Sequence, residues 1–345
     1  MSSTKNPIVV WGAGAIGGVV GAYLIRAGEA VLFVDQDRDH VAAINQHGMH
    51  IEGPIEDFTV RAPAVTPDAV QGQYERVLLC VKAQHTEAAA RDIVPHLAAD
   101  GYIASFQNGL NELVIADIAG AARTLGTFVN FSADYFAPGL IHFGGRGAVV
   151  LGELDGATTP RVTALHRLML GFEPDAIITP DIMGYLWGKL GYGALLFATA
   201  LTNASMCDAL GAEEAWPLYA RIAGEATAVA DSLGIVPRGF NGYDPAAFRD
   251  GANLAAQAAS FAAMVAHNAR STKTHSGIWR DLAVRKRKTE ADAQLGPIVS
   301  FGRAQQIATP AVAGLIAMIH EIEDGTRPMD WSNLAALSQS LPDWR

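Results

Sequence analysis

A glycine-rich turn near the amino terminus constrains the fold of this chain more than any other sequence feature. Residues 9–17 read VVWGAGAIG, so a G-x-G-x-x-G motif directly follows the apolar run Ile8–Trp11 and opens the helical pattern Ala15–Ala27. A second apolar run, Val31–Val34, follows, and the strand, helix and strand fit within about thirty residues. A glycine-rich turn can occur in any α/β protein, but this context favours dinucleotide binding between a parallel strand and its helix.

Each glycine of the motif has a physical role under this interpretation. Gly12 permits the tight turn, Gly14 lets the backbone approach a pyrophosphate, and Gly17 lets the helix pack closely against the strand. The start of the helix offers its N–H groups and the positive end of its dipole to the anion. The expected cofactor-binding loop comprises Gly12, Ala13, Gly14, Ala15, Ile16 and Gly17.

A carboxylate after the second strand bears on the choice of cofactor. Asp35 stands where a side chain contacts the adenosine ribose of a bound dinucleotide. It would accept hydrogen bonds from the two ribose hydroxyls and repel a 2′-phosphate, so the sequence favours NAD over NADP. Arg38 is the opposing feature, because a small loop shift would bring its guanidinium to a phosphate; otherwise it is a solvated surface residue.

The rest of the chain separates into two parts of different character. In the first part helical patterns alternate with short apolar runs, which are Val77–Val81, Ile103–Phe106, Leu125–Val129 and Ala148–Leu151. From about Thr179 these runs stop, and Ala-rich helical segments follow at Met183–Ala200, Glu213–Leu233, Leu254–Ala269, Ala291–Gln305 and Ala311–Glu323. We predict an α/β Rossmann domain with a parallel sheet over residues 1–179, and an all-helical substrate or dimerisation domain over residues 180–345.

Composition and charge exclude several functional classes. Half of the 345 residues are hydrophobic and 17% are charged, which excludes a mostly disordered chain. The net charge of −10 disfavours a nucleic-acid partner, and two cysteines fit a reducing compartment rather than a disulfide scaffold. No apolar stretch reaches the length of a bilayer span, and no spacing of His, Cys, Asp and Glu suggests a metal site. We therefore expect a cytoplasmic protein that acts on a small molecule.

Further motifs follow one another along the chain in a recognisable order. Beyond the glycine loop they are Val81-Lys82-Ala83, Gln107-Asn108-Gly109, Trp187-Gly188-Lys189-Leu190, Thr289-Glu290-Ala291-Asp292 and Ala308-Thr309-Pro310. In order and spacing the chain resembles the ketopantoate reductases, or 2-dehydropantoate 2-reductases, from Ile8 to about Glu323. The resemblance implies a Rossmann domain, a helical domain and a cleft between them in which a nicotinamide cofactor reduces a 2-oxo acid.

The resemblance also assigns roles to individual side chains. Lys189 would be the general acid that protonates the developing alkoxide, and the general base in the reverse direction. Asn108 would hold the nicotinamide side of the site and position the lysine or the substrate. Glu290 would bind a substrate hydroxyl or orient the lysine, and Lys82 would lie near the cofactor. The chemistry agrees, because an ammonium group stabilises negative charge on a carbonyl oxygen and supplies a proton.

Asn108 and Glu290 have structural alternatives, whereas Lys189 is less easily explained in that way. Lys189 lies in an otherwise apolar helical segment, which is unusual for a solvated lysine. Asn108 and Gly109 alone would form an ordinary turn. Glu290 follows four basic residues at 285–288 and would, on the plainer view, balance surface cations at a helix start.

The chain departs from the family at the positions that read the substrate. The reductases carry two asparagines one and two turns beyond the catalytic lysine, and here those positions are Gly193 and Phe197. Where the family has a serine for the substrate carboxylate, the alignment gives Gly277, with Ser276 beside it. Because lost polar partners are costly for a polar substrate, we expect a bulkier or more apolar substrate than ketopantoate.

Two neighbouring residues offer replacement contacts. Trp279 would present an aromatic face and Arg280 a bidentate carboxylate binder; the alternatives are core packing for the first and a salt bridge to Asp281 for the second. Because NAD more often serves oxidation, the resulting hypothesis includes a catabolic alcohol dehydrogenase.

Three other functions compete with this hypothesis. The chain would be a genuine 2-dehydropantoate 2-reductase if Ser276, Asn203 or Arg280 compensated for the lost asparagines. A non-catalytic dinucleotide-binding sensor is a second alternative, although the retained lysine, asparagine and glutamate argue against it. An opine or 3-hydroxy acid dehydrogenase would share the two-domain plan. The Ala-rich helical domain is compatible with a homodimer.

Overall fold

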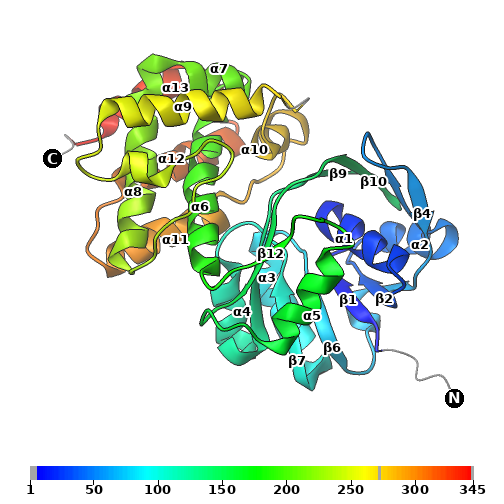
Figure 1. Ribbon diagram of the computed structural model, residues 1–345. Coiled ribbons are helices and arrows are strands. Elements are labelled where there is room, and N and C mark those ends of the chain that lie inside the picture. The colour runs from blue at the N-terminus through cyan, green and yellow to red at the C-terminus, as the bar shows by residue number, and fades with distance from the viewer. Residues whose placement is uncertain (1–5, 271–272, 343–345) are drawn as a thin grey trace, which may run out of the picture. The chain divides into compact units, whose positions relative to one another are not determined.

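The protein comprises two compact units in a computed structural model that describes residues 6–270 and 273–342 (Figure 1). The first unit is Met1–Ile182 and the second is Met183–Arg345. The first is a mixed α/β unit and the second is helical, as the sequence predicts.

The main sheet of the first unit runs in the order β12-β11-β8-β7-β6-β1-β2-β5. Its strands are β1 (Ile8–Trp11), β2 (Val31–Val34), β5 (Ala64–Val65), β6 (Tyr74–Leu79), β7 (Leu97–Ser105), β8 (Thr124–Val129), β11 (Val149–Glu153) and β12 (Ile177–Ile178). The pairs from β5 to β8 are parallel, but β11 pairs antiparallel with β8, which corrects the expectation of a parallel sheet. Strands β1 and β2 are buried along their whole length, as expected for a sheet covered on both faces.

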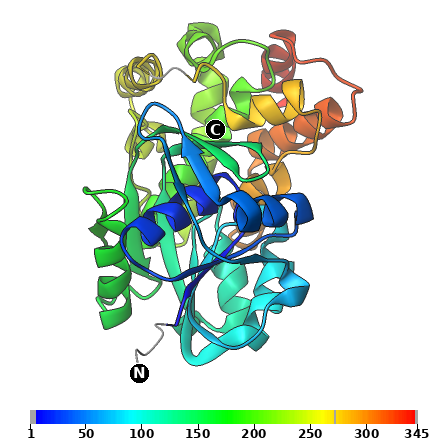
Figure 2. The ribbon, with the colours of Figure 1, turned by 90° about the vertical axis from the view of Figure 1, so that its right-hand side faces the viewer.

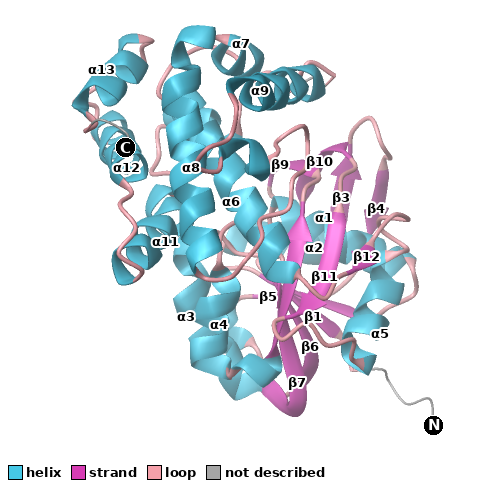
Figure 3. Ribbon diagram, turned by 60° about the vertical axis from the view of Figure 1, so that its left-hand side comes forward, coloured by secondary structure: helices cyan, strands magenta, loops and turns pink. Residues whose placement is uncertain are grey.

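Alternate residues of the central strands pack against opposite helical layers. Ile8 and Val10 belong to a core with α1 (Ala15–Arg26) and α5 (Pro160–Met169), whereas Val9 and Trp11 belong to a core with α3 (Thr86–Ile93) and α4 (Asn111–Ala119). This alternation is the period of two that a strand imposes. Figure 3 shows α3 and α4 on one side of the sheet and α5 on the other. The sheet edge at the carboxyl ends of β1, β6 and β7 carries the glycine loop and two further loops.

A smaller sheet, which the sequence reading did not anticipate, covers α1 (Figure 2). Its order is β4-β3-β10-β9, with β3 (Met49–Glu52), β4 (Phe58–Val60), β9 (Ser132–Ala137) and β10 (Leu140–Gly145). Tyr23 of α1 packs edge-on against Phe58 and Phe143 at ring-centroid distances of 5.4 and 5.9 Å. The helix α2 (Arg38–His47) starts at Asp37, whose carboxylate accepts hydrogen bonds from two backbone N–H groups.

The helical unit begins with the long helix α6 (Ile182–Thr199). The α-helices that follow it along the chain are α7 (Met206–Gly211), α8 (Trp216–Ser232), α9 (Leu254–Asn268), α10 (Gly277–Trp279), α11 (Ala291–Ala304), α12 (Pro310–Glu323) and α13 (Ser332–Ser340). A short π-helix, Arg280–Val284, follows α10. Glu225 of α8 accepts hydrogen bonds from the N–H groups of Ala311 and Val312, both at 2.9 Å, and so caps the start of α12. No helix within the described residues is long and apolar enough to cross a membrane.

Candidate active site

Close backbone contacts require glycine at two of the three glycine positions of the loop. Gly12 has φ +96°, and a Cβ there would lie 2.8 Å from backbone atoms of Cys80 and Val81. A Cβ on Gly17 would lie 2.0 Å from the carbonyl oxygen of Gly12, so only glycine lets α1 start this close to β1. By contrast, a Cβ on Gly14 would meet no atom within 4 Å. The open side of the loop is therefore at Gly14, where a ligand would approach.

The start of α1 is suited to an anion. Gly14 is the N-cap residue and brings no side-chain cap, and the first turn holds no acidic residue. The first helical residues, Ala15 and Ile16, are half-buried, whereas Ala13 is buried. Helix N–H groups and dipole therefore face the open side of the loop with nothing negative in the first turn, which fits a pyrophosphate.

Asp35 is held in place by the backbone of the loop. Its Oδ2 accepts a hydrogen bond from Ala13 N at 2.8 Å, and its Oδ1 accepts one from Asp37 N at 3.0 Å. A carboxylate has about four lone-pair sites, so these two bonds leave acceptor capacity for two hydroxyl donors. The half-buried carboxylate is thus fixed at the carboxyl end of β2, beside the glycine loop.

The surroundings of Asp35 are acidic. Asp37 and Asp39 follow it, and the Tyr135 hydroxyl donates to Asp37 Oδ2 at 3.2 Å. Burial, and after it the carboxylate of Asp37, raise the pKa of Tyr135 to about 12. Arg38 points to Asp68, with 3.7 Å between guanidinium nitrogen and carboxylate oxygen, in a pair that is largely exposed. The 2′-phosphate of an NADP ribose beside Asp35 would therefore meet several carboxylates. The one nearby cation, Arg38, already has an acidic neighbour in Asp68.

A buried histidine, which the sequence reading missed, also supports the loop. His40 is fully buried, and its Nδ1 accepts a hydrogen bond from Gly139 N at 2.9 Å. Its Nε2 must then carry the proton that it donates to Ala13 O, 2.9 Å away. The Tyr135 ring packs edge-on against the imidazole with a centroid distance of 5.0 Å. His40 therefore connects the glycine loop to the turn between β9 and β10.

A hydrogen-bonded chain fixes the loops that follow β6 and β7. Gln107 Nε2 donates to Val81 O at 2.9 Å and to the Thr86 hydroxyl at 2.7 Å. The Thr86 hydroxyl donates to Asn111 Oδ1 at 2.9 Å, and Asn111 Nδ2 donates to Asn108 O at 2.6 Å. Because β6 and β7 are parallel neighbours, this chain holds both loops at the same edge of the sheet.

The two predicted site residues of these loops are exposed. Lys82 directly precedes the 3₁₀-helix Ala83–His85, and Asn108 precedes Gly109, which has φ +100°. Since β1 pairs with β6 and β6 with β7, both side chains belong to the edge that carries the glycine loop. The first unit therefore gathers the predicted cofactor residues, from Gly12 to Asn108, along one edge of its sheet.

In the helical unit, Lys189 lies on a partly exposed stripe of α6. Tyr185, Lys189, Gly193 and Leu196 are half-buried, whereas most of their neighbours on the helix are buried. Their spacing of three or four residues places them on one helical face. Phe197 is fully buried and packs in the core of this unit. The position of the family's second asparagine is thus a core position here.

Glu290 stands at the start of α11 and is 8% exposed. Its predecessor Thr289 is anchored, because the backbone N–H and the hydroxyl of Thr289 both donate to Glu323 Oε1 at 2.7 Å. The Thr289 hydroxyl oxygen also accepts from Ala291 N at 3.2 Å. These bonds fix the first turn of α11 and with it the backbone of Glu290.

The segment around α10 carries the remaining predicted substrate residues. Ser276 is buried, and its hydroxyl oxygen accepts from Trp279 N at 3.1 Å, so it serves as the cap of α10. Gly277 is exposed, with no atom near a would-be Cβ. The indole Nε1 of Trp279 donates to Asn203 Oδ1 at 2.8 Å, and its ring packs on His275 at 4.0 Å between centroids.

Arg280 is half-buried at the start of the π-helix. The neighbouring Asp281 is buried and pairs with Arg285 at 3.0 Å and with Arg287 at 2.9 Å. The salt bridges that hold Asp281 therefore include two arginines further along the chain. Short π-helical segments often occur at functional sites, which is consistent with a site role for this segment.

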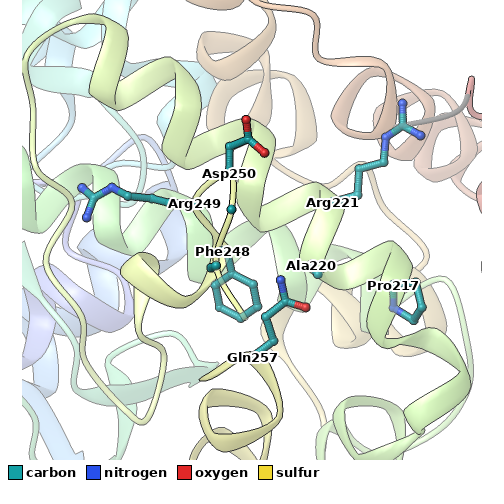
Figure 4. Close-up of a pocket in the computed structure, with 9 residues that line it drawn as sticks. Pro217, Ala220, Arg221, Phe248, Arg249, Asp250 and Gln257 are labelled. Atoms are coloured by element: carbon teal, nitrogen blue, oxygen red, sulfur yellow. The ribbon is translucent and has the colours of Figure 1, made fainter. Parts of the chain in front are cut away.

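Two surface hollows are lined by other residues. One of about 240 Å³ in the helical unit is lined by Arg221, Phe248, Arg249, Asp250 and Gln257, among others (Figure 4). Its Arg249 is already bound by both oxygens of Asp231, at 2.8 and 2.9 Å. The other, of about 490 Å³, includes Arg76 and Tyr102 in the first unit. No cluster of three or more His, Cys, Asp or Glu suited to a metal ion occurs in the described part of the chain.

A Rossmann-type unit with this glycine loop, followed by a helical unit that presents a lysine, is the arrangement of two-domain dinucleotide-dependent oxidoreductases. Comparison with known proteins narrows the class. Residues 8–156 match the family described as Ketopantoate reductase PanE/ApbA, and residues 181–323 match its C-terminal part. The chain belongs to the ketopantoate reductase family, whose members are oxidoreductases that act on CH–OH groups.

Individual relatives agree with this assignment. The 2-dehydropantoate 2-reductase of Mesorhizobium japonicum is 27% identical over 341 residues, which cover 91% of this chain and 97% of that protein. That of Pyrococcus abyssi is 30% identical over 183 residues, so this match spans 53% of this chain and 59% of the relative. The solved ternary structure of D-mandelate dehydrogenase with NADH and anilino(oxo)acetate has the same fold, with a TM-score of 0.80 at 22% identity over 92% of this chain and 99% of that chain.

Proposed function

We propose that this protein is an NAD-dependent oxidoreductase that interconverts a 2-oxo acid and its 2-hydroxy acid, with a substrate bulkier or more apolar than ketopantoate. The observation that carries the proposal is the fixed carboxylate of Asp35 beside an open glycine loop. The loop accommodates a pyrophosphate, and the carboxylate selects the ribose hydroxyls. D-mandelate dehydrogenase, which shares the fold, was solved with NADH, which is compatible with this cofactor.

The acidic surroundings support NAD over NADP. A 2′-phosphate on the ribose would approach Asp35, with Asp37 and Asp39 next in the chain. Arg38, the cation that the sequence offered as an alternative, lies 3.7 Å from Asp68. Recruiting it to a phosphate would separate this pair, although an exposed pair is worth only about 0–1 kcal/mol.

The side chains of this protein would transfer the proton and bind the substrate and the cofactor. When bound, the nicotinamide supplies or accepts the hydride. Lys189, as an ammonium, donates a proton to the developing alkoxide oxygen and, when neutral, takes the proton of the alcohol. Glu290 binds a substrate hydroxyl or orients the lysine, and Asn108 holds the nicotinamide side of the site. Lys82 lies on the same sheet edge as the glycine loop and would contact the cofactor.

The replaced family positions support a changed substrate. Gly193 leaves space one turn beyond Lys189, and Phe197 is committed to the core. Leu196 adds an apolar side chain to the half-buried stripe. The loss of the two asparagine amides, together with the space at Gly193, favours a substrate that is bulkier or more apolar than ketopantoate.

The Lys189→Ala variant tests the proposal of a catalytic lysine. We expect a fall in kcat of roughly 10²- to 10⁴-fold, the usual contribution of a positioned general acid. NADH binding, followed by fluorescence, should remain. Lys288→Ala, which removes an exposed lysine, is the matched control. Turnover by Lys189→Ala equal to that of the control, over a panel of 2-oxo acids, would contradict the assignment of Lys189 as the general acid.

The second candidate is a genuine 2-dehydropantoate 2-reductase, because the relatives described above carry that name. It requires other side chains to replace the lost asparagines. Two of the three candidates are already engaged, because the Ser276 hydroxyl caps α10 and the amide oxygen of Asn203 accepts from Trp279 Nε1. Those engagements weaken this candidate, and reduction of ketopantoate distinguishes it.

We also propose a cytoplasmic homodimer that acts on a small molecule. The low cysteine content fits a reducing compartment, and the Ala-rich helical unit is compatible with self-association. Sedimentation equilibrium of the purified protein tests the dimer, and a single species of 36.4 kDa would contradict it.

A further inference from the structure

An open space lies beside the lysine-bearing face of α6. A Cβ placed on Gly193 would meet a single heavy atom within 4 Å, the Oε1 of Gln294 at 3.9 Å. Gly193 follows Lys189 by one helical turn on the half-buried stripe. The side chain of Gln294 therefore reaches the space that Gly193 leaves open.

Gln294 is placed there by the helix that begins at Glu290. Its backbone N–H donates to Glu290 O at 2.8 Å, so Gln294 stands one turn along α11. Both α6 and α11 are labelled in Figure 1. Gly193 therefore stands one turn beyond Lys189 on α6, and Gln294 stands one turn beyond Glu290 on α11. The side-chain oxygen of Gln294 faces Gly193.

The amide of Gln294 is available for a ligand. Its side chain is half-buried and makes no hydrogen bond to any residue within 6–270 and 273–342. A glutamine amide offers two donors and one acceptor, and a half-turn about its last bond exchanges its oxygen and nitrogen. A half-buried amide without a protein partner gains most from a polar group brought by a ligand.

We propose that Gln294 is a specificity-determining residue. Its amide N–H donates a hydrogen bond to the carboxylate of the 2-oxo acid, which lies in the open space beside Gly193. The inference rests on the proposed function. In a 2-oxo acid the carboxylate is bonded to the carbonyl carbon that Lys189 would serve. The amide of Gln294, beside Gly193 and so one helical turn from Lys189, is therefore well placed to bind this carboxylate. A single oriented polar group among apolar neighbours fixes the direction in which a substrate binds.

Steady-state kinetics with NADH and phenylglyoxylate, the 2-oxo acid of mandelate, test this role. Gln294→Leu keeps most of the side-chain volume and removes the amide. We expect KM for phenylglyoxylate to rise roughly 10- to 100-fold, the range of a hydrogen bond to a charged group. The kcat should change far less, and NADH affinity should stay constant. Gln305→Leu, at the exposed end of α11, is the matched control.

A second variant separates substrate contact from a structural effect. Gly193→Asn in the Gln294→Leu background returns an amide to the same space, which has room for a side chain. We expect KM to recover, whereas Gly193→Ala should give no recovery. If KM of Gln294→Leu stays within about twofold of the wild type, or rises without recovery by Gly193→Asn, the role of Gln294 is refuted. A wild type that reduces no 2-oxo acid refutes the proposed function and this role together.

Discussion

At the scale of single residues, Asp35 has two tasks that one substitution can separate. Its carboxylate holds the glycine loop through Ala13 N and supplies the negative charge that disfavours a 2′-phosphate. Asn at this position keeps an oxygen acceptor for Ala13 N and removes the charge, whereas Ala removes both.

We therefore predict that Asp35→Asn shifts the preference for NADH over NADPH toward NADPH by about tenfold, equivalent to 1.4 kcal/mol. Asp35→Ala should weaken NADH binding further and leave NADPH relatively better. Fluorescence titration of both cofactors measures these affinities. A wild type that already prefers NADPH strongly would contradict the assignment of Asp35 as a selector of NAD.

The acidic residues around Asp35 also make the stability of the protein depend on pH, through Tyr135. Burial and the carboxylates of Asp37 and Asp35 raise the pKa of Tyr135 from 10.0 to about 12. Because the pKa is higher in the folded than in the unfolded state, the protonated hydroxyl adds stability that is complete below pH 10 and is lost as pH rises toward about 12. We predict that the unfolding free energy of the wild type falls more steeply over this range than that of Tyr135→Phe. Equal slopes in urea titrations would show that Tyr135 titrates normally.

The residues that could be predicted from the sequence depend on local spacing, whereas those that could not be predicted depend on long-range contacts. The roles expected for Gly12, Gly14 and Gly17 follow from local spacing after a strand; in the structure a Cβ at Gly12 or Gly17 would clash with backbone atoms, whereas Gly14 faces open space. His40 and Gln294 act through contacts with residues 27 to 101 positions away in the chain. Nothing in a single sequence marks which distant residues meet, so these two were not predicted.

At the scale of elements, α12 begins without a side-chain cap of its own. Thr309 is the N-cap residue but makes no side-chain cap bond, and Glu225 from α8 accepts from Ala311 N and Val312 N instead. The Arg221 guanidinium lies 3.5 Å from the Glu225 carboxylate. The buried carboxylate therefore connects α8 with the start of α12 in the helical unit.

We predict that Glu225→Ala lowers the free energy of unfolding by about 2–4 kcal/mol, because two buried N–H groups lose their acceptor. Glu225→Gln keeps one acceptor oxygen and should fall between the two. Glu214→Ala, at an exposed position near the start of α8, should stay within about 0.5 kcal/mol of the wild type. Urea unfolding measures all three, and a Glu225→Ala protein as stable as Glu214→Ala would contradict the capping role.

Most of the long elements could be predicted, and the smaller sheet could not. Strands β1 and β2 are continuous apolar runs bounded by polar residues, and they occur where the pattern placed them. Strand β9, by contrast, reads SADYFA and is half-buried almost throughout, so it lacks a clear alternation. It pairs with β10, which in turn pairs with β3 about ninety residues earlier, a long-range contact that no local pattern announces.

At the scale of the whole molecule, the change from alternating strands to Ala-rich helices indicated two units. The sequence pattern placed the change after Thr179, and the compact units divide after Ile182. The antiparallel β11 was not anticipated, because a short apolar run such as VVLGE carries no mark of its direction. The family follows from the motifs, whereas the proposed substrate rests on positions where this chain departs from them.

The most direct test of the proposed function compares two substrates and two cofactors in the wild-type protein. The rates of NADH and NADPH oxidation are measured with ketopantoate and with phenylglyoxylate, at saturating cofactor. We predict the highest kcat/KM with NADH and phenylglyoxylate, and negligible turnover of ketopantoate. Rapid reduction of ketopantoate, with either cofactor, at a kcat/KM above that for phenylglyoxylate would contradict the proposal and identify a 2-dehydropantoate 2-reductase.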